Sequence, residues 1–232
     1  FPVLAWENAG RKTTLTKVNG VYEIRTADDL RLVSYMVRNG ENFSGDTLEM
    51  RADIDLEGKA WTPIGGANET SSYQFRGTFD GRGYRIYNLK SNESDYGYGG
   101  LFGSINTGTI KNLGIESGMI VGSKRTAAIA GYVGGGSLIS NCYNKATVYA
   151  PTNIGSFVGY LTGKNIRIEN CYNVGLISSK SYGTTVGGLI GGISSSTTGL
   201  RIKNCYSIGY FYALIGTMMG KEEADCIVEN CY

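Results

Sequence analysis

The tripeptide Asn-Cys-Tyr occurs four times in this chain, each time after a short apolar stretch. Two earlier Asn residues in similar surroundings complete a set of anchors: Asn88, Asn112, Asn141, Asn170, Asn204 and Asn230. The residue two positions before each anchor is Ile or Val, and the residue after it is Leu in the first two copies and Cys in the last four. The anchors lie 24, 29, 29, 34 and 26 residues apart, so one structural unit repeats along the chain.

A second motif, phase-shifted from the first, lies between the anchors as "GGLFG", "AAIAG", "GSFVG", "GGLIG" and "GTMMG". Its closing glycines are Gly103, Gly131, Gly159, Gly191 and Gly220, which are 28, 28, 32 and 29 residues apart. Two independent markers therefore share one period. A period of this length, with two or three short strands and loops of variable length, is typical of one turn of a parallel β-helix.

Alternate residues after the anchors are apolar or small, as the inner face of a strand requires. At positions one, three, five and seven the four central turns read Leu113, Ile115, Ser117, Met119; Cys142, Asn144, Ala146, Val148; Cys171, Asn173, Gly175, Ile177; and Cys205, Ser207, Gly209, Phe211. The residues before the anchor have the opposite parity, so the chain must bend at the Asn. We predict that Asn turns the corner, Cys enters the core and Tyr points outward. Stacked Asn side chains would then bond along the axis.

The five cysteines could also indicate disulfides or a metal site, but the chain has no His and no CxxC. Cys residues on neighbouring turns would have parallel Cβ directions about 4.8 Å apart, whereas a disulfide needs a Cβ separation of about 3.8 Å. We therefore predict free, buried thiols and no metal. Cys226 fits the same scheme because it takes the core position that Ile166 and Leu200 hold in earlier turns.

Residues 1–80 lack the period. Asn19-Gly20 between β-rich flanks predicts a hairpin. Thr26 with Asp29 three residues later predicts the start of a helix that ends at Asn39-Gly40, and its apolar stripe (Leu30, Val33 and Val37) is expected to cover the open end of the solenoid. We divide the chain into residues 1–80, with the hairpin, capping helix and first irregular strands, and residues 81–232, with the β-helix repeats. A chain that runs from Phe1 to a Tyr inside a motif is expected to be part of a longer polypeptide in which the repeats continue.

Composition supports an all-β fold, since 35 Gly and 17 Tyr against 3 Pro favour short strands and tight turns. A formal net charge of +2 gives no electrostatic reason to expect nucleic acid or an anionic membrane as a partner. No apolar run approaches the roughly 18 residues that a membrane span needs, so this segment is not expected to insert into a membrane.

The ordered motifs "ADIDL", "WTPIG", "GTFDGRGYRIYNL", "GGLFG" and "TIKNLGI", followed by the Asn-Cys-Tyr repeats, resemble the GLUG-motif repeat family of bacterial surface proteins. The departures are Ala127, Ala128 and Thr217, which stand in place of glycine and leave the local strand geometry open. The resemblance implies a right-handed parallel β-helix from a secreted or cell-surface, adhesin-like bacterial protein with further domains. Some such repeats flank immunoglobulin-specific metallopeptidases. That activity is not expected here, because a zinc peptidase site needs His and the chain has none.

An enzyme on a β-helix would need clustered charged residues on one face of adjacent turns. At matching positions the chain has Glu116, Lys145, Val174 and Ile208, so the charge gives way to apolar residues and we predict no catalytic residues and no cofactor. Asp53, Asp55 and Asp80 could offer oxygen ligands to calcium, but turn carboxylates that accept backbone N–H bonds are the favoured interpretation.

One outer face becomes apolar and aromatic toward the C-terminus, which is typical of contact surfaces. The predicted ligand or partner surface comprises Tyr143, Tyr172, Val174, Leu176, Tyr206, Ile208 and Tyr210, with Tyr232 in line with the tyrosines. The alternative is a tyrosine stack that serves rigidity or lies under a missing segment. We expect a non-catalytic surface module with an adhesion or stalk role, which binds a host or neighbouring-cell glycan or protein. The competing hypothesis is a carbohydrate-active β-helix, lyase-like or hydrolase-like, with its site on loops 64–76 and 91–98.

Overall fold

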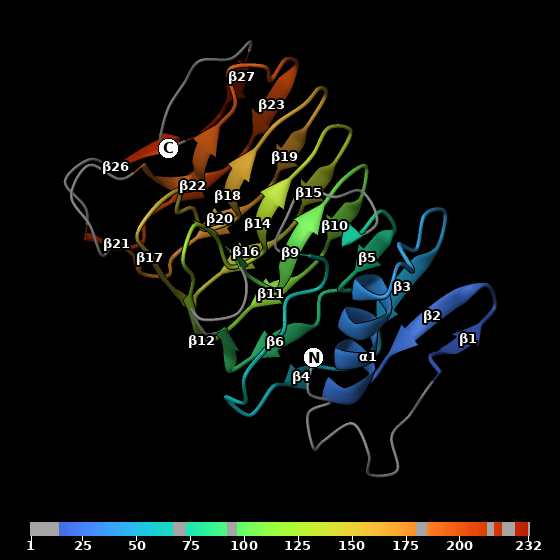
Figure 1. Ribbon diagram of the computed structural model, residues 1–232. Coiled ribbons are helices and arrows are strands. Elements are labelled where there is room, and N and C mark those ends of the chain that lie inside the picture. The colour runs from blue at the N-terminus through green and yellow to red at the C-terminus, as the bar shows by residue number, and fades with distance from the viewer. Residues whose placement is uncertain are drawn as a thin grey trace.

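The structure is a computed structural model that describes residues 14–66, 73–91, 97–179, 185–212, 216–219 and 226–231. The chain winds in successive turns around one apolar core, so strands far apart in sequence lie side by side (Figure 1). Within the described residues every strand pair is parallel except the first, β1 with β2. The predicted parallel β-helix is confirmed.

Each turn contributes strands to four faces. Sheet A has nine strands within the described residues, in the order β1 (Thr16–Val18), β2 (Val21–Ile24), β3 (Thr47–Met50), β5 (Thr78–Asp80), β10 (Thr109–Lys111), β15 (Leu138–Ser140), β19 (Arg167–Glu169), β23 (Leu200–Lys203) and β27 (Cys226–Glu229). Sheet B follows the Asn corner with β4 (Ile54–Asp55), β6 (Arg85–Tyr87), β11 (Gly114–Ile115), β16 (Tyr143–Asn144), β20 (Tyr172–Asn173) and β24 (Tyr206–Ser207).

The remaining faces complete each turn. Sheet C contains β7 (Leu89–Ser91), β12 (Gly118–Val121), β17 (Thr147–Ala150), β21 (Ile177–Ser179) and β25 (Phe211–Tyr212). Sheet D contains β9 (Phe102–Ile105), β14 (Ala130–Val133), β18 (Val158–Leu161), β22 (Val186–Ile193) and β26 (Gly216–Met219). The short strands β8 (Tyr98–Gly99) and β13 (Arg125–Thr126) pair with each other, and Thr126 continues this row through an isolated bridge to Ile154.

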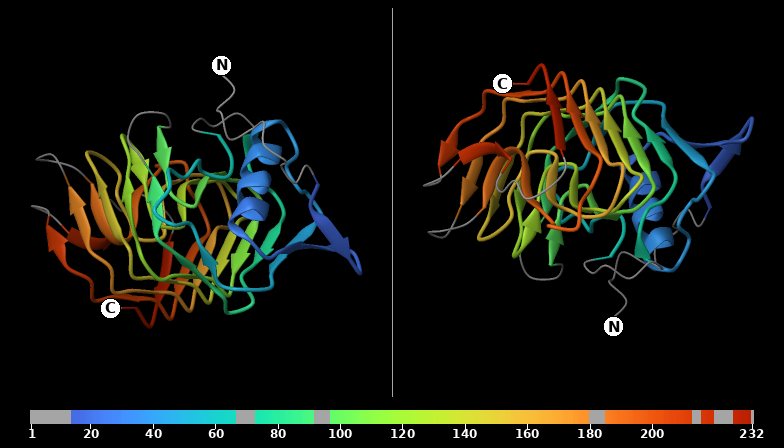
Figure 2. Two further views of the ribbon diagram at one scale, coloured as in Figure 1. Left: turned by 90° about the horizontal axis from the view of Figure 1, so that it is seen from below. Right: turned by 90° about the horizontal axis from the view of Figure 1, so that it is seen from above.

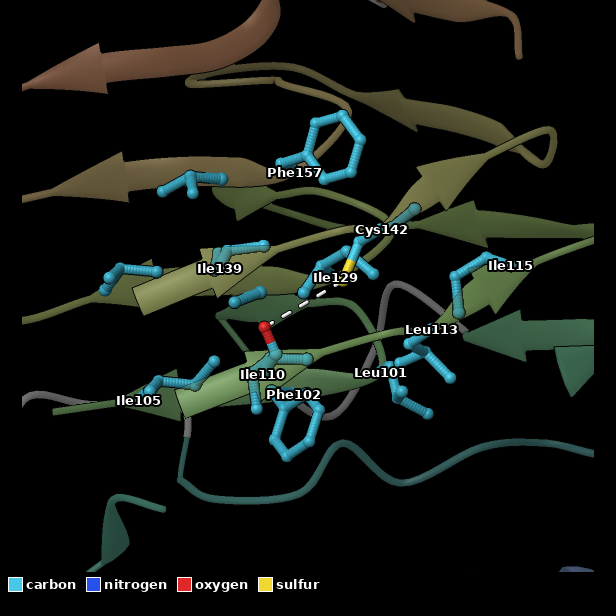
Figure 3. Packing of buried hydrophobic residues seen from close by; sticks show 14 of the residues in the cluster. Leu101, Phe102, Ile105, Ile110, Leu113, Ile115, Ile129, Ile139, Cys142 and Phe157 are labelled. Atoms are coloured by element: carbon cyan, nitrogen blue, oxygen red, sulfur yellow. Dashed lines mark hydrogen bonds between the residues drawn. The ribbon is translucent and has the colours of Figure 1, made fainter. Parts of the chain in front are cut away.

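The core is filled by one column of side chains for each inward position. Ile110, Ile139 and Ile168 are paired in register on sheet A and are at most 1% exposed. Figure 3 shows Ile110, Ile139, Cys142 and Phe157 gathered in this core, with the Cys142 thiol directed at the carbonyl oxygen of Ile110. Because each turn covers the apolar edge of the one before, a turn becomes stable only when its neighbours are in place.

The Asn corners form a continuous ladder of side-chain amides. The anchors from Asn112 to Asn230 have φ between 51° and 54°, a left-handed conformation that Asn tolerates better than most residues. Each Nδ2 donates to the Oδ1 of the preceding anchor at 2.9 to 3.1 Å, and Asn112 donates to Asp80 at 2.9 Å. The predicted corner and axial bonding are therefore confirmed for these five residues.

The prediction that Asn88 belongs to this column is wrong. Ile86, two residues before it, pairs with Ile115 in sheet B rather than with a sheet A strand. Asn88 turns the next corner, with φ 55°, and donates to Asp55 at 2.8 Å. On the preceding sheet A strand, Asp80 pairs with Lys111 and its carboxylate accepts the bond from Asn112. The Asp80 carboxylate therefore forms the N-terminal end of the asparagine ladder.

The inner position predicted for Met119 is also wrong, since this side chain is 52% exposed. Ile120 is buried instead and pairs with Val148, so this turn has one residue more than the next between sheets B and C. The extra residue is accommodated at Gly118, whose φ is 147°. One inserted residue moves every following side chain to the opposite face.

Ser117, which was also predicted to face inward, is only half-buried and accepts the Asn88 backbone N–H at 2.9 Å. The remaining inner positions of the next two turns follow the predicted alternation. Cys142, Cys171 and Cys205 are at most 1% exposed, as are Asn144, Asn173 and Val148. Ser207 and Gly209 on the last turn are half-buried, and the side chain of Phe211 lies outside the described residues. Val228 is 42% exposed because no described strand pairs beyond β27.

The closing glycines of the second motif let a second layer of chain pack against sheet D. A Cβ at Gly131 would lie 2.7 Å from the carbonyl oxygen of Arg125, and one at Gly103 would lie 2.8 Å from that of Gly66. Since these neighbours are backbone atoms, a side chain here would push the outer layer away. The departure at Ala127 and Ala128 leaves the strand intact, because β14 pairs in register with β9 and β18. Thr217 lies on β26, but its side chain and Gly220 lie outside the described residues.

The N-terminal elements match the prediction. Asn19 and Gly20, with φ 49° and 85°, form the turn between β1 and β2. Helix α1 (Ala27–Arg38) begins with a capping box between Thr26 and Asp29 and ends at Asn39. Its residues Leu30, Val33 and Val37 are fully buried in the main core, and the helix lies across the N-terminal end of the solenoid (Figure 2).

Candidate functional site

Three tyrosines form an ordered stack on the outer face of sheet B. The parallel pairing places Tyr143, Tyr172 and Tyr206 in line on β16, β20 and β24. Their ring centroids are 5.2 and 5.3 Å apart, with interplanar angles of 11° and 10°. All three are half-buried, while the neighbouring Cys171 is 1% exposed, so the prediction of Cys inside and Tyr outside is confirmed. Tyr232, which continues the sequence pattern, lies outside the described residues.

A glycine and a carboxylate define the N-terminal end of the stack. Gly114 pairs with Tyr143, and a Cβ at Gly114 would overlap the Tyr143 ring, which covers this backbone. The Tyr143 hydroxyl donates to Glu116 at 2.5 Å, and Lys145 bonds the other oxygen of Glu116 at 2.7 Å. Lys145 and then Tyr143 lower the pKa of Glu116, while burial and the Glu116 carboxylate raise the pKa of Tyr143. Glu116 and Lys145, the two charged residues at the matching positions considered for catalysis, thus form an ion pair with each other.

Toward the C-terminus the same surface becomes apolar and exposed. Val174 is 37% exposed, Ile208 is 67% exposed and Tyr210 is 79% exposed, while Leu176 is half-buried. Backbone bonds keep these residues in line from turn to turn, since Ile208 N donates to Asn173 O and Ile177 N donates to Tyr210 O. The structure therefore brings the seven predicted residues together on consecutive turns, along sheet B and the bend that leads into sheet C. We call these seven residues the tyrosine surface.

The carboxylates considered for calcium are held by other groups. Asp53 accepts the backbone N–H of Arg85 at 2.9 Å, Asp55 accepts that of Glu57 at 2.7 Å, and Asp80 accepts that of Arg82 at 2.8 Å. This is the pattern of corner carboxylates that the sequence favours. Among the described residues no group of three or more His, Cys, Asp or Glu is arranged to hold a metal. The loops of the carbohydrate-active hypothesis fall partly outside the description, at residues 67–72 and 92–96.

No disulfide joins the described cysteines, and Cys142, Cys171 and Cys205 are buried in the solenoid. Cys171 Sγ lies 3.2 Å from the carbonyl oxygen of Glu169 and 3.8 Å from that of Ile139 on the preceding turn. Burial raises the pKa of the Cys171 thiol, which keeps it protonated and unreactive at neutral pH. Cys226 is half-buried against the core and pairs with Leu200, as predicted.

The sequence reasoning missed a second aromatic group, on sheet D. Tyr98 and Tyr132 stack at 5.7 Å, and the Arg125 guanidinium lies 4.1 Å from the ring centroid of Tyr160 and 5.1 Å from that of Tyr98. Arg125 also donates to the Tyr98 hydroxyl at 2.7 Å. A signal was available, because Tyr132 and Tyr160 each directly follow a closing glycine of the second motif. Since Tyr98 and Tyr132 are at most 7% exposed, this cluster ties the outer layer to the solenoid rather than offering a surface.

Comparison with known proteins places similar sequence inside much longer chains. No protein-family model matches this chain. It is 30% identical over 172 residues to halomucin of Haloquadratum walsbyi, a match of 69% of this chain and 2% of halomucin. It is 31% identical over 115 residues to a protein of Evansella cellulosilytica provisionally named a Gly-rich membrane protein, a match of 49% of this chain and 13% of that protein. The chain thus spans a small part of both relatives.

A solved structure shares the fold. The crystal structure of a Bacteroides ovatus protein, provisionally named an immunoglobulin A1 protease, superimposes with a TM-score of 0.65 at 22% identity. The match covers 91% of this chain and 74% of that protein's chain. At this identity the likeness concerns the fold. Within the described residues, no helix is both long and apolar enough to cross a membrane. The chain is a β-solenoid module, and one of its relatives is named as a membrane protein.

Proposed function

We propose that this chain is a non-catalytic β-solenoid module, of the GLUG-repeat type, in a secreted or cell-surface protein, and that the tyrosine surface is its adhesive contact. The motifs that resemble GLUG repeats and the names of the two relatives support the surface setting. The bacterial source and the further domains of the polypeptide that the resemblance implies are part of the proposal.

The observation that carries the proposal is the exposure of Ile208 and Tyr210 beside an ordered stack. Large apolar side chains exposed on adjacent positions mark contact surfaces, and aromatic residues dominate the binding energy of many interfaces. The stacked rings of Tyr143 and Tyr172 bury their faces against each other, so they present edges and hydroxyls rather than flat platforms. This geometry favours a protein partner over sugar rings stacked on the tyrosines.

The proposal is tested by binding to an array of extracellular-matrix proteins and glycans. The double variant Ile208→Ser/Tyr210→Ser should lose binding to whichever array protein the unmodified chain binds. Tyr35→Ser is the matched control, because Tyr35 is 52% exposed and lies on helix α1, away from sheets B and C. Unchanged binding by the double variant would exclude the tyrosine surface, and cleavage of a polysaccharide by the unmodified chain would favour the carbohydrate-active alternative.

A further inference from the structure

A second outer face, on sheet A, carries charged side chains at matching positions of adjacent turns. Strands β19 and β23 pair so that Arg167 lies beside Arg201 and Glu169 lies beside Lys203. The residues between them, Ile168 and Ile202, are fully buried, so the charged residues point to solvent. This face lies around the Asn corner from the tyrosine surface, which occupies sheet B and the start of sheet C.

Two adjoining hollows follow these strands. The first, of about 270 Å³, is lined by Asn165, Arg167, Gly199, Leu200, Arg201 and Ile227. The second, of about 460 Å³, is lined by Arg167, Glu169, Asn170, Arg201, Lys203 and Asn204. Since both hollows share Arg167 and Arg201, they form one depression that extends across β19 and β23 to the asparagine ladder. We call it the sheet A groove, and Figure 1 shows the two strands near the C-terminal end of the stack.

Among the described residues, the groove has more cationic than acidic side chains. Arg167 lies 3.7 Å from Glu169, a loose ion pair, and Lys203 lies 3.5 Å from Glu229. In the part of the chain that the structure describes, no carboxylate forms an ion pair with Arg201. Among the described residues, three cationic side chains therefore face two carboxylates. The Arg201 guanidinium, beside that of Arg167 on the neighbouring turn, suits a ligand carboxylate that it can bind through two parallel N–H bonds.

The asparagine ladder adds donors and acceptors at the edge of the groove. Asn170 and Asn204 are exposed, and each uses one N–H and one oxygen lone pair in the ladder. Because an Asn side chain has two N–H donors and an oxygen with two lone pairs, the ladder leaves one N–H and one lone pair available on each of these residues. A donor and an acceptor side by side match a hydroxyl group, which both donates and accepts. They recur at the spacing of adjacent turns, about 4.8 Å.

We propose that the sheet A groove binds an acidic polysaccharide, with a uronate carboxylate on Arg201 and Arg167 and sugar hydroxyls on Asn170 and Asn204. An acidic peptide would satisfy the guanidinium groups, but it has no rows of hydroxyls for the amides. A nucleic acid is disfavoured because the chain's net charge is only +2. This site is separate from the tyrosine surface and does not depend on its function.

The test is titration calorimetry of the whole chain with polygalacturonate oligomers at low ionic strength. Arg201→Gln should weaken binding by about tenfold, or 1.4 kcal/mol. Lys90→Gln removes the same charge from an exposed position on sheet C and should leave the affinity unchanged. Added salt should weaken binding, because exposed charges are screened. Circular dichroism with heating verifies that each variant retains the fold.

Several results would overturn the proposal. These are no measurable binding of polygalacturonate, equal affinity for neutral dextran, equal binding by Arg201→Gln, or tighter binding of poly-glutamate or oligothymidylate. The double variant Ile208→Ser/Tyr210→Ser should bind polygalacturonate normally. A loss of binding in that variant would place the ligand on the tyrosine surface instead, so failure of the two proposals can be distinguished.

Discussion

Replacing Asn170 by Ala tests the contribution of the asparagine ladder. Asn170 has φ 54°, accepts from Asn204 at 2.9 Å and donates to Asn141 at 3.1 Å. A left-handed conformation costs Ala about 1 kcal/mol, and the two exposed hydrogen bonds contribute about 0.5 kcal/mol each. We therefore expect Asn170→Ala to lower the free energy of unfolding by about 2 kcal/mol.

Asn170→Gly separates the two contributions, because Gly adopts the left-handed conformation without strain. It should cost about 1 kcal/mol less than Asn170→Ala in urea unfolding followed by circular dichroism. Equal losses for Ala and Gly would refute the left-handed corner. A Gly variant as stable as the unmodified chain would show that the ladder bonds contribute nothing.

Three further variants test other parts of the structure. Cys171→Asp places a carboxylate in the core and should lower the free energy of unfolding by about 4 kcal/mol. Tyr172→Asp removes two ring contacts and should lower it by at most about 2 kcal/mol. Equal losses of stability for the two variants in urea unfolding would contradict the assignment of Cys171 to the inside and Tyr172 to the outside. Gly159→Ala places a Cβ 2.6 Å from the Arg125 carbonyl carbon and should cost about 1 to 3 kcal/mol, so an unchanged unfolding midpoint would contradict the packed outer layer. Because the pKa of Glu116 is lowered from 4.5 on folding, its stabilising effect is present above pH 4.5 and is lost as the pH falls through the folded pKa. The melting difference between the unmodified chain and Glu116→Gln should therefore shrink in acid, and a constant difference would contradict the ion pair with Lys145.

The sequence predicted the inside and outside of most turns because two signals coincide. The alternation of side chains assigns faces, and the anchor Asn fixes where the alternation restarts. Where the loop between strands keeps its length, as from Asn144 to Val148 and from Asn173 to Ile177, the buried residues agree with the prediction. At Gly118 an extra residue shifts the alternation of inward and outward side chains, and the repeat pattern in the sequence does not indicate this insertion.

Asn88 shows a second limit of the pattern. The stretch "RIYN", which ends at Asn88 before sheet C, is nearly identical to "RIEN", which ends at Asn170 before sheet B. Both corners have the same pattern, because each strand ends with a buried β-branched residue followed two positions later by an Asn in the left-handed conformation. Only the pairing of Ile86 with Ile115 separates the two. The short separation of 24 residues before Asn112 was the available signal.

The candidate surfaces were predictable to different degrees. The tyrosine surface follows from in-register stacking, so its residues could be read from the repeat. The sheet A groove depends on which charged neighbours pair with one another, and Arg167, Glu169 and Lys203 look like an ordinary solvated face in sequence. The role of the closing glycines was hidden for a similar reason, because the outer layer that packs on Gly131 and Gly159 comes from loops without a motif.

Hydrogen bonds between successive turns test the central feature of the fold, the parallel, in-register stacking. The Tyr172 amide donates to the carbonyl of Cys142, and the Tyr206 amide donates to that of Cys171. A long-range HNCO experiment on deuterated protein should show couplings across both bonds, each linking a tyrosine amide to the Cys one turn earlier. Couplings that instead join strands running in opposite directions, or a shift of one residue in these pairs, would contradict the stacked solenoid and the faces derived from it.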